Sequence, residues 1–122
     1  MMILVDTSIW ADHFGRRDAD LDDILQREIV LGHEFVTAEI ALGNLADPAG
    51  TIWMLESMPQ ARIANHPELM ILIRRGRLAG SGIGFVDAHL LAACQLSGAR
   101  LWTRDKRLRA QAEVLGVSWE PS

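Results

Sequence analysis

The sequence predicts an α/β fold in which a mainly parallel sheet is covered by helices on both faces. Short apolar runs that fit buried strands alternate with longer segments whose apolar residues recur at helical spacing. This alternation favours a parallel sheet, because parallel strands are joined by crossover helices. No repeat, low-complexity tract or linker interrupts the 122 residues, so we expect one domain over residues 1–122.

Two strands and four helices are expected in the first half of the chain. Strands are indicated by short apolar runs, and helices by apolar residues three or four apart after a capping residue. In order, these elements are a strand at residues 2–5, a helix from Thr7 or Ser8 to Gly15, a helical stripe over residues 21–31, a strand at 35–36, a helix that Thr37 can cap and that runs to about Ala46, and, after a turn at 47–50, a short helix over 52–58.

The second half of the chain is expected to contain three more strands and three more helices. Proline favours a first helical position, and glycine favours loops and helix ends. In order, these elements are a strand at 61–64, a helix that begins at Pro67, a glycine-rich loop at 80–84, a strongly apolar helix over 85–96 closed by Gly98, a strand at 100–103, a helix over 105–115 and a strand at 117–119.

Bulk properties limit the classes of function. Hydrophobic residues make up 49% of the chain and charged residues 23%, as in ordinary globular domains. The single cysteine, Cys94, rules out a disulfide framework. The first residues lack the basic segment of a signal peptide, and no apolar stretch approaches the roughly 18 residues of a membrane span. We therefore expect a soluble cytoplasmic protein.

Four acidic residues fall at positions where an α/β sheet carries its site. Asp6 and Asp105 follow expected strands, and ligands of such sheets bind at the carboxyl ends of the strands. Glu39 and Asp87 lie near expected helix starts, where a carboxylate also has a structural explanation in the helix dipole. Asp87 is harder to explain in that way, because its helix is otherwise apolar and a buried carboxylate is costly without a partner.

Four carboxylates that converge at one sheet edge would repel each other unless a cation lay between them. Oxygen ligands without a histidine or cysteine cluster favour Mg²⁺ or Mn²⁺ over zinc. The four histidines show no paired metal-ligand spacing, so we expect structural roles for them.

Four segments carry a resemblance to a known family. In order they are residues 4–10 (LVDTSIW), 37–40 (TAEI), 84–93 (GFVDAHLLAA) and 101–108 (LWTRDKRL). Together, in this order and spacing, they resemble the signature segments of PIN-domain proteins, and most closely the VapC-type toxins of bacterial toxin–antitoxin pairs. The resemblance covers nearly the whole chain, and no acidic position is missing from it.

This resemblance implies a fold and an activity. It implies a five-stranded parallel sheet between helices, and hydrolysis of RNA phosphodiester bonds, often in transfer RNA, with Mg²⁺ or Mn²⁺. It also implies a homodimer and a small VapB-type antitoxin that blocks the site. The four acidic positions of the family correspond to Asp6, Glu39, Asp87 and Asp105 in this chain.

The chemistry expected from these residues is metal-assisted hydrolysis, in which a cation acidifies water and offsets phosphate charge. We expect Asp6 and Asp87 to bind metal directly, and Glu39 and Asp105 to bind directly or through water. The sequence leaves one ion or two open. Two hydroxyl residues that match the family pattern are expected to orient these ligands or to contact phosphate, namely Ser8 and Thr103.

The net charge of −4 argues against a nucleic-acid binder when it is taken alone. If four of the 16 acidic residues belong to the site, however, the remainder balances the 12 lysines and arginines. Phosphate binding needs local positive charge rather than a basic whole. The basic residues expected to contact RNA are Arg74, Arg75, Arg77, Arg104 and Lys106.

Other functions remain open from the sequence. One is a non-catalytic PIN-fold binding module, and another is a housekeeping RNA-processing nuclease. A phosphatase with an aspartyl nucleophile would need an Asp-x-Asp pair, but Ser8 occupies the second position. A signalling receiver would need adjacent acids before the first helix, and these are absent.

Overall fold

The centre of the fold is a short strand buried between two parallel neighbours. In the computed structural model, which describes residues 1–122, β1 (Ile3–Val5) lies between β2 (Val30–Leu31) and β3 (Arg100–Trp102). Leu4 pairs with Leu31 on one side and with Leu101 on the other. All three residues of β1 are buried, as expected for the inner strand of a parallel sheet covered on both faces.

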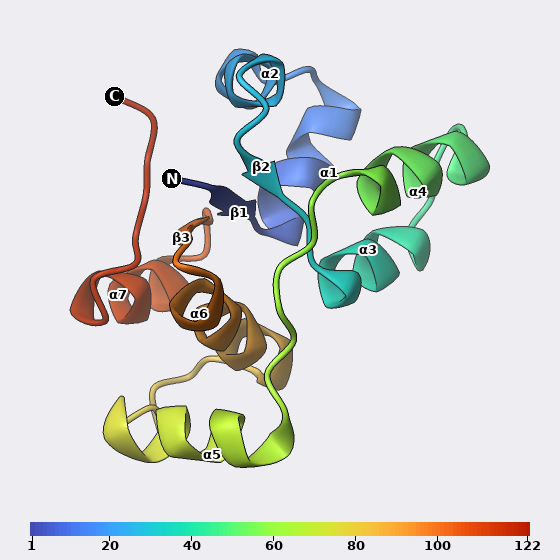
Figure 1. Cartoon of the computed structure of the whole chain (residues 1–122). Helices are drawn as coiled ribbons and strands as arrows, with labels where there is room; N and C mark the ends of the chain where they lie inside the picture. The colour runs from blue at the N-terminus through green and yellow to red at the C-terminus, as the bar shows by residue number, and fades with distance from the viewer.

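Seven helices surround this sheet (Figure 1). They are α1 (Thr7–Gly15), α2 (Ala19–Gln26), α3 (Glu34–Ala41), α4 (Pro48–Ser57), α5 (His66–Arg75), α6 (Phe85–Ser97) and α7 (Lys106–Val114). Helices α6 and α7 lie beside β3, and α5 packs on α6. Helix α3 packs against both α1 and α4. No helix is long and apolar enough to cross a membrane.

The parallel sheet flanked by helices is confirmed, but it has three strands rather than the expected five. Two single-residue parallel bridges flank it, Gly32 with Gln60 and Leu101 with Ser118. The expected strands at 61–64 and 117–119 are therefore reduced to one bridge each, in or next to the predicted segments. Only two backbone hydrogen bonds hold each of them to the sheet.

The expected strand at 35–36 is wrong, because these residues lie in α3. The second strand comes earlier, at β2, within the segment expected to continue a helix. Glu28 has a φ of 57°, a left-handed conformation that ends the helical path after α2. His33 rather than Thr37 then caps α3, since its Nδ1 accepts the Phe35 N–H at 3.0 Å.

The turn expected at residues 47–50 is instead the start of a helix. Asp47 is the N-cap of α4, and its Oδ1 accepts the Gly50 N–H at 3.1 Å. Pro48 occupies the first turn, where its missing N–H costs nothing. The remaining helices agree with the sequence. Helix α6 ends one residue later than predicted, and α7 begins one residue later and ends one residue earlier than predicted.

The hydrophobic core is one cluster of 29 buried residues. Helix α6 contributes an unbroken buried stretch from Ala88 to Cys94. Its first turn is less buried than this stretch, so the Asp87 carboxylate sits where the core opens to the surface. The sheet and α6 together therefore form a rigid base for the acidic residues.

Candidate active site

Asp6 is the most enclosed of the predicted acidic residues, with 7% of its surface exposed. It follows β1 directly and caps α1, where its Oδ1 accepts the Thr7 N–H at 2.8 Å. Its Oδ2 accepts two hydroxyl groups, Ser8 Oγ at 3.0 Å and Thr103 Oγ1 at 2.7 Å. Three donors therefore fix the orientation of this carboxylate.

Thr103 and Asp105 reach the same place from the end of β3. The Asp6 N–H donates to the Trp102 carbonyl at 3.0 Å, which keeps the ends of β1 and β3 side by side. Thr103 Oγ1 also accepts the Asp105 N–H at 3.1 Å. Asp105 Oδ1 accepts the Leu108 N–H at 3.0 Å and so caps α7. One buried hydroxyl thus links two of the predicted acids.

Glu39 enters the site from α3. Its Oε1 accepts the Thr7 hydroxyl at 2.8 Å, and Thr7 is also the residue whose N–H binds Asp6. Glu39 is exposed, whereas Asp6 is buried, so the two differ in their freedom to move. The sequence suggested only a capping role for Thr7. Its position directly after Asp6 was the one feature of the sequence that could have indicated a role in the site.

Asp87 provides the electrostatic link among the four acids. It is half-buried in the first turn of α6, and its Oδ2 accepts the Gly84 N–H at 3.3 Å. Burial raises the pKa of Asp87, and the charges of Asp6, Asp105 and Glu39 raise it further, while the Gly84 N–H opposes them. The other three predicted carboxylates therefore all lie close enough to Asp87 to act on its charge at this edge of the sheet.

The donor chemistry of this cluster fits a hard divalent cation. The four acids supply only carboxylate oxygens, and a cation would relieve the repulsion that disfavours the ionised form of Asp87. No three acidic, histidine or cysteine side chains are close enough together to form a ready metal cage. The exposed side chains of Glu39 and Asp105 would therefore have to turn inward to complete one.

The predicted basic residues are not brought together. Arg104 pairs with Asp12 and, at 2.7 Å, with Asp18, so two acids already compensate its charge. Lys106, in the first turn of α7, forms no ion pair. Ser8 Oγ accepts the Arg104 N–H at 3.3 Å, so the Arg104 backbone, rather than its side chain, touches the acidic cluster.

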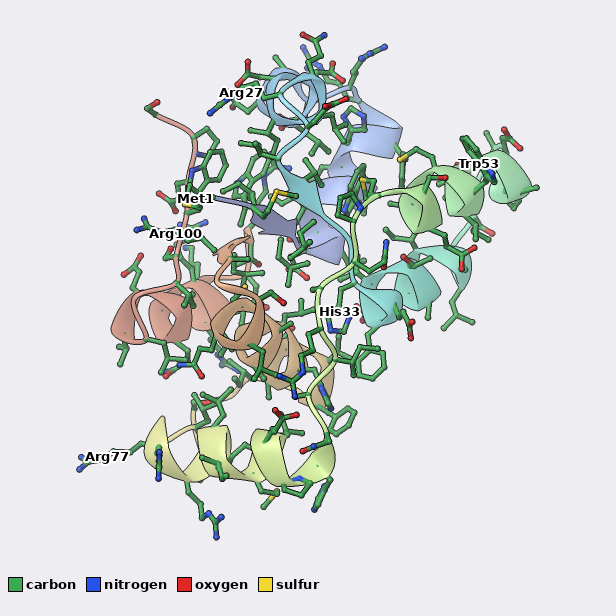
Figure 2. All side chains as sticks on the ribbon, in the orientation of Figure 1. Met1, Arg27, His33, Trp53, Arg77 and Arg100 are labelled. Atoms are coloured by element: carbon green, nitrogen blue, oxygen red, sulfur yellow. The ribbon has the colours of Figure 1, made fainter.

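The arginines of α5 lie away from this cluster. Arg75 lines a hollow together with Gln95 and Leu96, at the C-terminal end of α6, whereas Asp87 lies in its first turn. At 1.5 Å per residue, this separation along α6 is about 12 Å. Figure 2 shows Arg77 beyond the end of α5, pointing away from the rest of the chain.

Comparison with known proteins gives a match to a family model and two similar relatives. A family model described as the PIN domain matches residues 3–114. Two relatives, both named Ribonuclease VapC32 and found in two strains of Mycobacterium tuberculosis, are each 42% identical to the chain over 118 residues. The aligned region covers 96% of this chain and 95% of each relative.

Proposed function

This chain belongs to the PIN-domain family, in its VapC-type group, and from that premise we propose that it is a metal-dependent endoribonuclease and the toxin of a toxin–antitoxin pair. The relatives that match it over almost their full length carry the name ribonuclease. The observation that carries the proposal is the convergence of four carboxylates at the sheet edge where α/β folds bind ligands, where the charges of Asp6, Asp105 and Glu39 all reach Asp87.

In this proposal Asp6 and Asp87 bind the divalent ion directly, and Glu39 and Asp105 complete the site directly or through water. When bound, the ion supplies positive charge against the scissile phosphate and acidifies water. Asp6 presents its oxygens in one orientation because three donors hold it. Glu39, which is exposed to solvent, orients the attacking water and accepts its proton in this proposal.

The hydroxyl residues are proposed to act through the acids. Thr103 holds Asp6 and the Asp105 backbone at once, so it sets the distance between the ends of β1 and β3. Ser8 Oγ likewise makes two bonds, since it donates to Asp6 Oδ2 and accepts the Arg104 N–H. Such supporting groups position metal ligands, and their loss weakens metal binding or activity.

We propose that Lys106 contacts RNA next to the site, since it is exposed and unpaired. Arg104 contributes less, because Asp12 and Asp18 already compensate it. The arginines in and just after α5 would meet only RNA that extends along α6. These three residues are Arg74, Arg75 and Arg77.

A VapB-type antitoxin, a homodimer, transfer RNA substrates and a cytoplasmic location are proposed from family membership. Nothing favours the alternatives of a binding module or a housekeeping nuclease. All four acids are present, and the relatives are named ribonucleases of the VapC type.

The test is cleavage of a total transfer RNA pool by the purified protein with Mg²⁺, with Mn²⁺ and with EDTA. Asp6→Asn and Asp87→Asn should abolish cleavage. Asp23→Asn is the matched control, because Asp23 pairs only with Arg27 on the surface of α2. Cleavage that persists in EDTA or in folded Asp87→Asn protein would contradict the proposal, as would an inactive wild type in both metals.

A further inference from the structure

Two of the three phenylalanines in the chain meet beside the carboxylate cluster. Phe85 is the first residue of α6, and Phe35 lies in the first turn of α3. Their ring centroids are 6.5 Å apart, and the ring planes differ by 24°. The pair comes from the same two helices that carry Glu39 and Asp87, although neither ring has a part in the proposed chemistry.

The position of each ring relative to the acids follows from helix geometry. Phe35 and Glu39 are four residues apart in α3 and therefore lie on the same face of that helix. Phe85 follows Gly84, whose N–H donates to the Asp87 carboxylate, but its ring lies on the α6 face of His89, four residues on, rather than on that of Asp87. The aromatic pair thus forms a rim between α3 and α6, beside the Gly84–Asp87 hydrogen bond.

Two buried histidines support these rings from behind. The His89 ring lies edge-on to Phe85, with centroids 4.6 Å apart, and edge-on to Phe35 at 4.8 Å. His33 packs against Phe35 at 5.1 Å, and Figure 2 shows it between α3 and α6. His33 and His89 are 0% and 5% exposed. The Phe35 and Phe85 rings therefore pack on the rings of two buried histidines.

In contrast to its support, the Phe85 side chain is 65% exposed. The position of Gly84, directly before it, is open as well, because a Cβ built there would meet no atom within 4 Å. A rigid, exposed ring loses little conformational entropy when a flat ligand stacks on it. Such rings are what proteins use to bind the unpaired bases of single-stranded RNA.

We propose that Phe85, backed by Phe35, stacks on an unpaired nucleobase next to the scissile phosphate, so that the enzyme selects single-stranded RNA at this position. The proposal rests on the proposed ribonuclease function and adds a base-binding subsite to it. A duplex base cannot reach the ring without leaving its stack. Stacking accepts all four bases, so the subsite selects strand conformation rather than sequence.

The experiment compares Phe85→Leu and Phe85→Trp with wild type on single-stranded RNA oligonucleotides that contain one mapped cleavage site. Trp53→Leu is the control, because Trp53 is an exposed aromatic residue on α4, far from His33 in Figure 2. We expect Phe85→Leu to raise KM by roughly 5- to 150-fold, the cost of losing one base–aromatic stack. Phe85→Trp and Trp53→Leu should stay near wild type.

A second set of oligonucleotides carries one abasic ribose at each position around the cut. At the stacked position, the abasic substrate should raise the wild-type KM as much as Phe85→Leu does, and Phe85→Leu should cause no further loss on it. Unchanged KM in folded Phe85→Leu, or equal loss on every abasic substrate, would show that the ring serves another purpose, such as covering by a protein partner. A wild type that cuts no RNA overturns the ribonuclease and the subsite together.

Discussion

A buried histidine gives this protein a stability that depends on pH. His33 caps α3 with its Nδ1, has no surface exposed, and leaves its Nε2 without a hydrogen-bond partner. Burial, and to a smaller extent the charge of His89, lowers the pKa of His33 from 6.5 to about 4. The imidazole is therefore neutral in the folded protein at any pH well above 4.

The expected effect follows from proton linkage. In the unfolded chain His33 has a pKa of about 6.5, so between pH 6.5 and pH 4 the unfolded chain binds a proton that the folded protein excludes. The free energy of unfolding therefore falls as the pH is lowered through this window, and the full contribution is present only above pH 6.5. The difference in pKa corresponds to about 3 kcal/mol at pH 4.

The assay is urea unfolding of wild type, His33→Asn and His66→Asn at several pH values from 7.5 to 4. Asparagine can still accept the Phe35 N–H, but it does not titrate in this range. We expect the stability advantage of wild type over His33→Asn to shrink by about 3 kcal/mol between pH 7.5 and pH 4. His66→Asn, at an exposed position, should follow wild type. Parallel curves for wild type and His33→Asn would refute the argument.

Four further predictions concern the site. Asp87→Asn removes a half-buried charge that the other carboxylates repel, so its melting temperature should equal or exceed that of wild type while RNA cleavage falls ~100-fold or more. In the same melting assay, Mn²⁺ at 100 times its Kd should add about 2.7 kcal/mol to wild type and much less to Asp87→Asn, with reversal by EDTA. Thr103→Val removes a buried hydroxyl that donates to the Asp6 carboxylate and should cost about 1.5–3 kcal/mol in urea unfolding, whereas Thr103→Ser should not. Arg104→Ala should cost less than about 1 kcal/mol and leave RNA affinity unchanged in fluorescence anisotropy, whereas Lys106→Ala should weaken it.

The parts of the fold that the sequence predicted well have strong local signals. Helix α6 is apolar along most of its length and ends at Gly98, whose φ of 63° suits glycine. The second strand had no such signal. Val30–Leu31 and Phe35–Val36 are equally apolar pairs, and only the left-handed turn at Glu28 and the cap at His33 decide which pair becomes the strand.

The same distinction applies to the candidate site. The ends of the strands could be located from the sequence, so Asp6 and Asp105 were predicted to share one edge of the sheet. The partners of Arg104 could not be predicted, because Asp12 and Asp18 lie in α1 and at the start of α2, 92 and 86 residues away along the chain. The aromatic rim was also missed, since Phe35 and Phe85 meet only through the packing of α3 near α6.

The strand order also has a consequence for when the protein becomes active during its synthesis. The first strand cannot complete its pairing until β3, at Arg100–Trp102, has been translated, and Thr103 and Asp105 come later still. At about 5–20 residues per second, a nascent chain spends several seconds with Asp6 lacking its buried hydroxyl partner. A ribosome-bound or prematurely ended chain therefore carries Asp6, Glu39 and Asp87 without an assembled site. The activity proposed for this protein therefore begins only after translation has passed Asp105.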